Sequence, residues 1–476
     1  MPVDEPKAAE NELDDEDEWQ LYASAGYAST GLISAEQVLT DEQDQDEIWF
    51  DGDDFDSEGS TINWDAPPCP ASLGIAHVIK LGSCDYCLRR IGGKRIDLPD
   101  PEAGAQLRQE AYDSDKELST SILQEFCPLC ENLFDDVDNI VERVFGTLSG
   151  FEFSTIQFGI HLAKDLIQEE DRIRSKYGSP GSNPLKAALV EAIHHKIRDA
   201  NHEVAFVKER PDVMALVDGL TLRVDVDVRP VFLYGRYRKL VRDIPQTRWP
   251  CRSCRGRAEG CESCNGSGLQ YPDSVQDLIG EPIREALLAE NTSFHGMGRE
   301  DIDVRCLGSG RPFVLEVKRP AKRNHSLEEL VRKVNEHASG KVEVDTFSWC
   351  NRTKINEVKQ SRSDKTYTIR FRVDGPTDQN SISEAISSLS GTVIDQETPK
   401  RVSHRRAAKI RKRKVTSIDS IIFEDDEVQI TIRCEAGTYV KELIHSDEGR
   451  TSPSVKSVIG RECEVVWLDV EEIHAD

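Results

Sequence analysis

Four C-x-x-C pairs constrain the fold of this chain more than any other feature of its sequence. They use eight of its 13 cysteines, namely Cys84 with Cys87, Cys127 with Cys130, Cys251 with Cys254, and Cys261 with Cys264. A C-x-x-C turn places two thiolates on one side of a tight loop, and two such turns supply the four ligands of a tetrahedral zinc site. In an intracellular chain this spacing indicates metal rather than disulfides. We therefore expect two structural zinc sites, with reduced, unliganded pairs as the alternative for each.

The second expected site has the more compact spacing. In "CRSCRGRAEGCESCNGSG" six residues separate the two pairs, and the glycines permit the positive φ angles of tight turns. Between the first two pairs, a longer segment that contains "LRQEAYDS" predicts a helix. Similar knuckles occur in Hsp40-type chaperones, but the chain has no His-Pro-Asp signature. Four cysteine ligands leave no open coordination position, so we expect no catalytic zinc.

The chain is strongly acidic, with 60 Lys and Arg residues against 87 Asp and Glu residues and a formal net charge of −27. Residues 1–70 contain runs such as "NELDDEDEWQ" with little apolar periodicity, which predicts a disordered acidic tail. Acidic residues stay frequent beyond it, which favours either a halophilic cytoplasm or an ordinary acidic protein with an acidic tail. No apolar run is long enough to span a bilayer, and no segment near Met1 resembles a signal peptide. We expect a cytoplasmic protein without a membrane partner.

A chain of 476 residues exceeds one ordinary core, so we expect several domains. After the tail they are a cysteine-containing subdomain at 71–150, a mixed α/β unit at 151–245, and an α/β domain at 246–476 with the cysteine knuckle inserted at 251–268. In the middle unit, Asn183 and Pro184 predict the start of a helix whose apolar face repeats every four residues from Leu185 to Ile197. "ALVDGLTLRVDVDVRPVFL" alternates apolar and polar residues around a turn at Asp218 and Gly219, as in a half-buried sheet.

The last domain combines helix and strand signals. Ser274 predicts the start of one helix, and Ser326 with Glu329 predicts a capping box before another. Strands are expected at "PFVLEV", "YTIRFRV", "VQITIRCEAG" and "CEVVWLDV". We interpret "LGSGRPF" as a hairpin turn that enters a strand, because it lacks the spacing of a phosphate-binding loop.

Two basic segments stand out in so acidic a chain. "YGRYRKLVRDIPQTRW" interleaves cations with aromatic residues, which predicts contacts with phosphates and stacked bases, with a solvated basic strand edge as the alternative. "RVSHRRAAKIRKRKV" is the most basic segment and predicts a polyanionic partner. The cations expected to contact this partner are Arg236, Arg238, Lys239, Arg405, Arg406 and Arg411.

The stretch "GREDIDVR" carries the candidate chemistry. It places Asp301 and Asp303 between Arg299 and Arg305. Taken alone, either carboxylate is best explained as a surface salt bridge with one of these arginines. The chain has no convincing dinucleotide or methyl-donor fingerprint, so we expect no nucleotide or redox cofactor.

Together, "GREDIDVR", "YGRYRKLVRDIPQT", the cysteine knuckle, "RVSHRRAAKIRKRKV" and "GTYVKELIHSDEGRTSPSV" resemble the archaeal tRNA pseudouridine synthases of the Pus-ten family. The resemblance runs from the first cysteine pair to the C-terminus. It implies an α+β fold in which a zinc-binding subdomain at 71–150 and a THUMP-type RNA-binding domain at 151–245 precede a pseudouridine synthase catalytic domain with a mixed, mainly antiparallel sheet. The implied reaction is isomerisation of tRNA uridines at positions 54 and 55 of the T arm, without a catalytic cofactor.

The resemblance also assigns site residues. Arg299-Glu300-Asp301 matches the superfamily pattern, which implies that Asp301 is catalytic and that Asp303 is a structural neighbour or a partner of Arg305. The implied site contains a stacking tyrosine in Lys365-Thr366-Tyr367, a cation that lowers the aspartate pKa, and an apolar wall. Tyr367 is the stacking tyrosine, Lys441 or Arg299 is the cation, and Leu468 is the apolar wall. Tyr439 is a further substrate-binding residue. A zinc-containing, non-catalytic tRNA-binding or RNA-chaperone protein is the alternative, and a THUMP-bearing methyltransferase or thiolation enzyme lacks its cofactor fingerprint.

Overall fold

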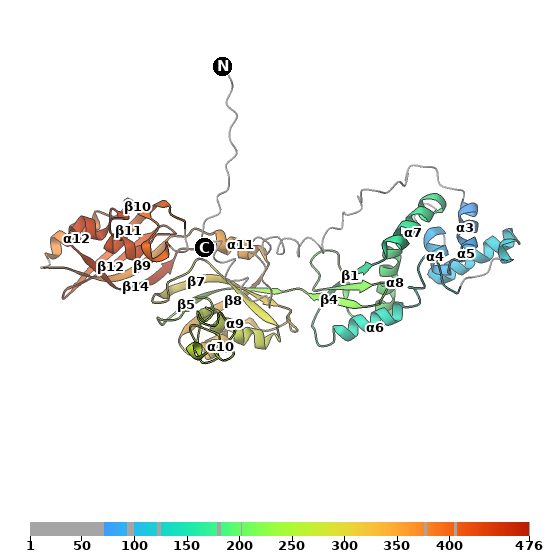
Figure 1. Cartoon of the computed structure of the whole chain (residues 1–476), viewed down its shortest axis with the longest axis horizontal. Coiled ribbons are helices and arrows are strands. Elements are labelled where there is room, and N and C mark those ends of the chain that lie inside the picture. The colour runs from blue at the N-terminus through green and yellow to red at the C-terminus, as the bar shows by residue number, and fades with distance from the viewer. Residues whose placement is uncertain are drawn as a thin grey trace, which may run out of the picture. The chain divides into compact units, whose positions relative to one another are not determined.

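The computed structural model of the protein describes residues 71–92, 100–120, 125–178, 182–200, 202–375, 378–403 and 407–475 (Figure 1). The predicted acidic tail at 1–70 lies outside the described residues, and so do Arg405 and Arg406. Within these ranges, no helix has the length and apolar character needed to cross a membrane. The described residues form two compact units, which meet in the sequence between Arg229 and Pro230.

The first unit packs helices on a four-stranded sheet. Its elements are α3 (Ala71–Lys80), α4 (Asp85–Gly92), α5 (Asp100–Ser114), η1 (Leu118–Thr120), α6 (Val137–Thr147), β1 (Thr155–His161), α7 (Lys164–Tyr177), α8 (Leu185–Asp199), β2 (Ala205–Phe206), β3 (Val213–Asp218) and β4 (Val224–Val228). The strand order is β2-β1-β3-β4, and β1 is parallel to β2 and β3. One buried core runs from Ile75 to Val228, so the predicted parts at 71–150 and 151–228 share a single interior.

Helix α8 and the hairpin of β3 and β4 confirm two predictions in part. The helix buries the predicted apolar face, but it begins at Leu185 with Pro184, not Asn183, as its N-cap. The turn after β3 is wider than predicted. Leu220 is 79% exposed there. Leu222 has a φ of 55°. Polar bonds from the turn to Asp218 hold this conformation, so the alternation resumes only in β4.

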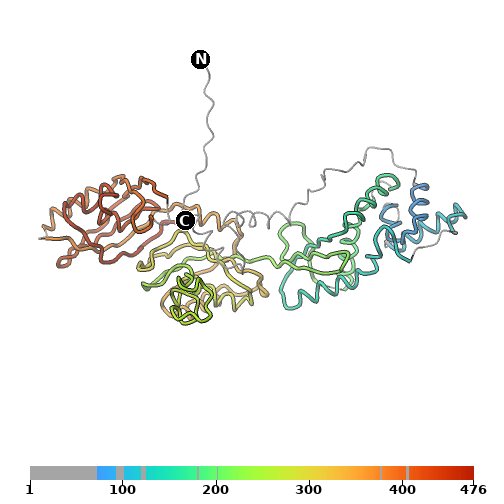
Figure 2. The backbone as a smooth tube through the Cα atoms, viewed as in Figure 1, coloured from blue at the N-terminus to red at the C-terminus, as the bar shows by residue number. Residues whose placement is uncertain are grey.

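The second unit is built on a ten-stranded sheet of order β13-β10-β11-β12-β9-β14-β7-β5-β8, with β6 beside β7. Figure 2 draws the backbone of this unit in the colours from yellow-green to red. Its strands are β5 (Val231–Lys239), β6 (Asn291–Gly296), β7 (Arg305–Lys318), β8 (Val342–Cys350), β9 (Lys365–Val373), β10 (Val393–Glu397), β11 (Ile410–Glu424), β12 (Glu427–Cys434), β13 (Thr451–Ser452) and β14 (Cys463–Ile473). Among the described pairs of this sheet, β14 with β7 is parallel and the others are antiparallel. The expected mixed, mainly antiparallel sheet is therefore confirmed.

The helices of this unit are η2 (Glu262–Cys264), α9 (Val275–Ala286), α10 (Leu327–Ala338), α11 (Thr353–Gln360), α12 (Gln379–Ser387), η3 (Lys400–Val402), α13 (Val440–His445) and α14 (Val455–Ile459). Figure 1 shows α9 and α10 together beside β5, β7 and β8. Ser274 and Ser326 cap these two helices as predicted, by accepting from Asp277 N and Glu329 N. The reciprocal half of the second capping box is absent among the described residues, because the Glu329 carboxylate binds Arg332.

The predicted domain boundary at 245/246 is wrong. Strand β5 pairs with β7 on one side and with β8 on the other, so it belongs to the ten-stranded sheet. Its residues Leu233 and Tyr237 are fully buried in the core beneath α9 and α10. An alternating strand pattern does not specify its partners, and here those partners lie in the second unit.

The predicted hairpin turn at "LGSGRPF" is also wrong. The glycines lie inside β7, at a register shift between two stretches that pair with β5: Cys306 is opposite Lys239, and Arg311–Val317 is opposite Val231–Tyr237. The start of β7 also pairs with β14. Gly308 and Gly310 have φ angles of 56° and 79°. A Cβ at Gly308 would lie 1.9 Å from Glu471 O, and one at Gly310 would lie 2.7 Å from Tyr237 O. The glycines therefore let β14 and β5 approach β7 closely where the pairing with β5 shifts register.

Candidate functional site

The candidate aspartate lies in the loop that joins β6 to β7. Directly after the loop, Arg305 pairs in register with Asp469 of β14, and Val470 pairs with Tyr367 of β9. The central strands of the sheet therefore bring the "GRED" loop, Tyr367 and the β14 residue Leu468 into one region.

Two cations contact the Asp301 carboxylate, and each comes from a distant part of the sequence. Arg401 of η3 donates from Nη1 to Oδ2 at 2.9 Å. The Lys441 Nζ of α13 lies 3.6 Å from the same oxygen. The Asp301 side chain is 31% exposed, so solvent screens these charges only in part.

The charge state of Asp301 follows from these neighbours. Burial raises the pKa of Asp301, but Arg401, Lys441 and Arg299 lower it, and the net result is a pKa below the ordinary value of 3.8. The carboxylate is therefore ionised near neutral pH, as a nucleophile or a base must be.

Arg401 was not predicted to contact the candidate aspartate. Its Nε donates to Glu442 Oε1 at 2.6 Å, and the Glu442 side chain is only 2% exposed. Burial lowers the pKa of Arg401, but the bond to Glu442 and the charge of Asp301 raise it above its usual range. The sequence assigned Arg401 to a polyanion-binding segment. Glu442, directly after Lys441 in the sequence, is the buried group of this pair, and its carboxylate needs a cation such as Arg401.

Asp303 is held by Lys441 rather than by Arg305. Lys441 Nζ lies 2.8 Å and 2.9 Å from the two Asp303 carboxylate oxygens. Arg305 instead donates to Asp469, whose side chain is 1% exposed, at 2.6 Å. Of the two alternatives given for Asp303, the pairing with Arg305 is wrong, because strand register places Arg305 beside Asp469.

A buried glutamine sets the start of α13. Gln396 of β10 accepts from Tyr439 N and donates to Tyr439 O, both at 2.9 Å. Tyr439 is half-buried and is the N-cap of α13, so these bonds fix the turn that carries Lys441 and Glu442. Two further predicted site residues, Tyr367 and Leu468, are 9% and 7% exposed and share a core with Val304. Arg299 lies over the ring of Trp249, 5.9 Å from its centroid.

The first basic segment turns inward. Lys239 is fully buried, so the prediction that it contacts phosphates is wrong. Arg236 donates to the carbonyl oxygens of Ser309 and Ile473, both at 2.9 Å, and Arg238 pairs with Asp345 at 2.6 Å. The alternative, a solvated basic strand edge, is also wrong for β5, because this strand has a neighbouring strand on both sides.

The second basic segment is more exposed. In and just before β11, Lys409, Lys412 and Lys414 are exposed, whereas Arg411 is half-buried and donates to Thr398 Oγ1 at 3.0 Å.

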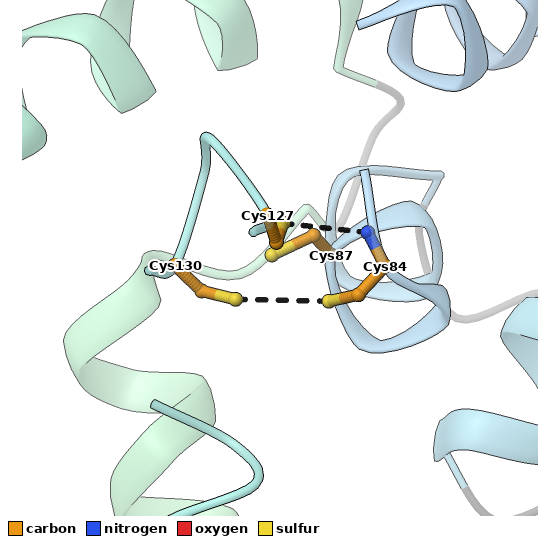
Figure 3. A group of neighbouring side chains, drawn as sticks. All are labelled: Cys84, Cys87, Cys127 and Cys130. Carbon is orange, nitrogen blue, oxygen red and sulfur yellow. Dashed lines mark hydrogen bonds between the residues drawn. The ribbon is translucent and has the colours of Figure 1, made fainter. Parts of the chain in front are cut away.

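Both predicted cysteine sets converge. Figure 3 shows Cys84 and Cys87, at the start of α4, facing Cys127 and Cys130. In each set all four sulfur atoms lie within 4.8 Å of one another. Sulfur atoms are 3.6 Å apart in Cys84 and Cys130, and 3.7 Å apart in Cys254 and Cys264. A tetrahedral zinc with Zn–S bonds of about 2.3 Å requires sulfur separations of about 3.8 Å. Each set can therefore hold a structural metal ion.

This chain is similar to known proteins over more than half of its length. A family model described as "Pus10, C-terminal" matches residues 232–474. A tRNA pseudouridine synthase Pus10 from Methanothrix thermoacetophila is 40% identical over 340 residues, which cover 71% of this chain and 74% of the relative. Relatives of the same name are 34% identical in Halorubrum lacusprofundi, over 83% of this chain and 93% of theirs, and 38% identical in Methanothermobacter marburgensis, over 82% and 94%. A solved Cbf5-Nop10-Gar1 complex is similar over 42% of this chain and 45% of that chain, at 18% identity and a TM-score of 0.26.

Proposed function

The chain belongs to the Pus10 family of tRNA pseudouridine synthases, and from this premise we propose that it isomerises uridines 54 and 55 in the T arm of tRNA with Asp301 as the catalytic carboxylate. Membership makes the chain an isomerase, so the alternative of a non-catalytic tRNA-binding or RNA-chaperone protein is set aside. The observation that carries the choice of Asp301 is the pair of cations at its carboxylate, Arg401 at 2.9 Å and Lys441 at 3.6 Å.

The reaction needs an ionised group of this kind. Pseudouridine forms when the bond between N1 of uracil and C1′ of the ribose breaks, the base turns, and C5 joins C1′. The C5 proton is lost and N1 gains one, so no redox cofactor or nucleotide takes part. A carboxylate can attack the sugar or take a proton only in its ionised form. Although burial raises the pKa of Asp301, Arg401 and Lys441 lower it, which favours the ionised form.

Tyr367 and Leu468 are proposed to receive the uracil. An aromatic face grips a base that has left the RNA stack and still lets it turn. Leu468 supplies an apolar wall on the neighbouring strand β14. Tyr439, at the N-cap of α13, is proposed as a further substrate contact next to Lys441.

The tRNA is proposed to lie along the second basic segment. Lys409, Lys412 and Lys414 are exposed and can neutralise phosphates. Arg405, Arg406 and Arg411 are proposed, from the sequence of this segment, to contact further phosphates. The part of the first unit that follows residue 150 is proposed to act as a THUMP-type RNA-binding domain. Each four-cysteine set is proposed to hold zinc, because thiolate ligands at tetrahedral spacing favour zinc and a complete set has a structural role.

The proposal is tested by incubating the full chain with unmodified tRNA transcript, without added cofactor, and mapping pseudouridine by carbodiimide-dependent primer extension. Stops at positions 54 and 55 are expected with the wild type and absent with Asp301→Ala. Asp303→Asn is the matched control, because it removes a second carboxylate of the same loop that also contacts Lys441. Loss of product in Asp303→Asn with full activity in Asp301→Ala would contradict the assignment of Asp301.

A further inference from the structure

We propose that Lys239 and Arg242 are positioning residues that fix Asp301 through the main chain of its loop. Both belong to the basic segment "YGRYRKLVRDIPQTRW", in which the sequence predicted contacts with phosphates. Together they bind the carbonyl oxygens of three consecutive loop residues, from Asp301 to Asp303. The inference rests on the proposed role of Asp301 and adds residues that support it from beneath.

Lys239 supports the loop from inside the protein. Its ammonium group is fully buried at the end of β5 and donates to the carbonyl oxygens of Ile244, Asp301 and Ile302, at 3.0, 3.1 and 3.2 Å. An ammonium group carries three donors, and here all three have acceptors. Burying a cation is unfavourable unless it is paired, and the Glu300 carboxylate lies 3.9 Å away. Lys239 is thus fully engaged in holding this loop.

Arg242 supports the same loop from the side of β14. Its Nη1 donates to Asp303 O at 2.7 Å and to Leu468 O at 2.9 Å. Its Nη2 lies 2.8 Å from the buried Asp469 carboxylate. One planar guanidinium therefore ties the loop of Asp301 to the strand proposed to supply the wall of the uracil pocket.

Buried side chains also hold Glu300, the residue that precedes Asp301. Glu300 accepts from the Tyr237 hydroxyl at 2.9 Å, and Arg311 Nε lies 2.8 Å from its other oxygen. Gln246 donates to both Tyr237 Oη and Gly298 O, at 2.9 Å each. The loop is thereby fixed on both sides of Asp301, while Asp301 directs its carboxylate to Arg401 and Lys441.

This support matters because Arg401 and Lys441 come from distant segments and meet the carboxylate only if the loop is correctly placed. A catalytic group displaced by about 1 Å can lose up to about 100-fold in rate.

Phosphate binding is the competing role for Lys239 and Arg242, and it predicts a different result. A phosphate-binding lysine lowers affinity for every tRNA when removed and reduces the salt slope by about one.

The test uses the full chain with Lys239→Met, Arg242→Gln and a control, Lys333→Met. Lys333 is on the surface of α10 and its Nζ lies 3.9 Å from Glu329. Single-turnover rates at saturating tRNA and Kd across salt concentrations are measured, with thermal unfolding of each variant. We expect rates lowered by about 10-fold to 100-fold in Lys239→Met and Arg242→Gln, with Kd and its salt slope as in the wild type. Lys333→Met should match the wild type in both.

Two results would overturn the inference: wild-type rates in both variants, or weaker tRNA binding with a reduced salt slope and an unchanged rate at saturation. Arg242 is 29% exposed, so its variant decides the question if Lys239→Met does not fold. Failure of the proposed function itself is distinguishable, because then the wild type would make no pseudouridine or Asp301→Ala would retain activity.

Discussion

Arg401 and Asp301, 100 positions apart in the sequence, are joined by a hydrogen bond of 2.9 Å between Nη1 and Oδ2. Arg401 is in turn anchored by the buried Glu442, the neighbour of Lys441 on α13. One short helix thus contributes both a cation for the aspartate and the anion that positions a second cation. The charge of the proposed catalytic group depends on this arrangement.

Replacing Arg401 by Gln should shift the acid limb of the pH profile to higher pH. Asp301 acts in its ionised form, so activity falls as pH drops through its folded-state pKa. Burial raises that pKa, and Arg401 is the largest of the influences that lower it. Single-turnover rates against pH check the shift, and Arg401→Lys should restore part of it. An acid limb at the same pH in Arg401→Gln would contradict the proposed role of Arg401.

Replacing Glu442 by Gln should weaken the same site without removing a cation. The variant keeps the size of the side chain but removes the charge that holds Arg401 at 2.6 Å. Charge-assisted hydrogen bonds are worth about 1.5–3 kcal/mol, so we expect a rate lowered by about 10-fold or more at saturating tRNA. Glu435→Gln is the control, because Glu435 is exposed and outside α13. Equal rates in the two variants would show that Glu442 does not position Arg401.

Replacing Lys409, Lys412 and Lys414 together by Gln should weaken binding of all tRNAs alike. Each lysine that neutralises a phosphate should, when replaced, reduce the slope of log K against log salt by about one, and turnover at saturation should persist. Filter binding at several salt concentrations measures the slope. A variant with wild-type slope and Kd would mean that these lysines form only a solvated face of β11.

Replacing Glu170 by Gln should destabilise the first unit. Glu170 pairs with Arg90, and the two side chains are only 3% and 2% exposed. The variant leaves the arginine charge buried without its partner, which costs about 3–5 kcal/mol. Glu169→Gln is the matched control, because Glu169 lies on the same helix, is 48% exposed and should change stability by less than about 0.5 kcal/mol. Urea unfolding followed by circular dichroism compares them.

Replacing Cys254 by Ser should remove one metal ion per chain. The four thiolates of its set lie within 4.8 Å of one another, so losing one ligand opens the site. Cys350→Ser is the control, because this half-buried free cysteine lies outside both sets. Elemental analysis of the purified chains should give two zinc ions in the wild type and in Cys350→Ser. Equal zinc content in Cys254→Ser would contradict a site at the knuckle.

Features encoded by local spacing were predictable. The two cysteine sets, the caps Ser274 and Ser326, and the helix from Leu185 follow from residues a few positions apart. Features that depend on pairing were not. The alternating pattern of β5 is the same whichever sheet it joins, so the boundary was misplaced. The glycines of β7 resembled a turn because their close contacts with Glu471 and Tyr237 involve other strands.

The sequence by itself determined the two four-cysteine sets and the helix caps at Ser274 and Ser326. Its resemblance to a family supplied the mainly antiparallel sheet and the candidate Asp301. The resemblance implied Lys441 or Arg299 as the cation near that carboxylate, but only the tertiary structure added Arg401 and placed Lys441 between Asp301 and Asp303. The sequence of a basic segment does not show which of its cations are buried. Lys239 and Arg242 therefore resembled phosphate ligands, although both bind backbone carbonyl oxygens in the fold. Arg401 likewise reaches Asp301 only because η3, α13 and the β6–β7 loop meet in the fold. Electrostatic energy depends on distance in space and on desolvation, and neither is a property of the neighbouring letters.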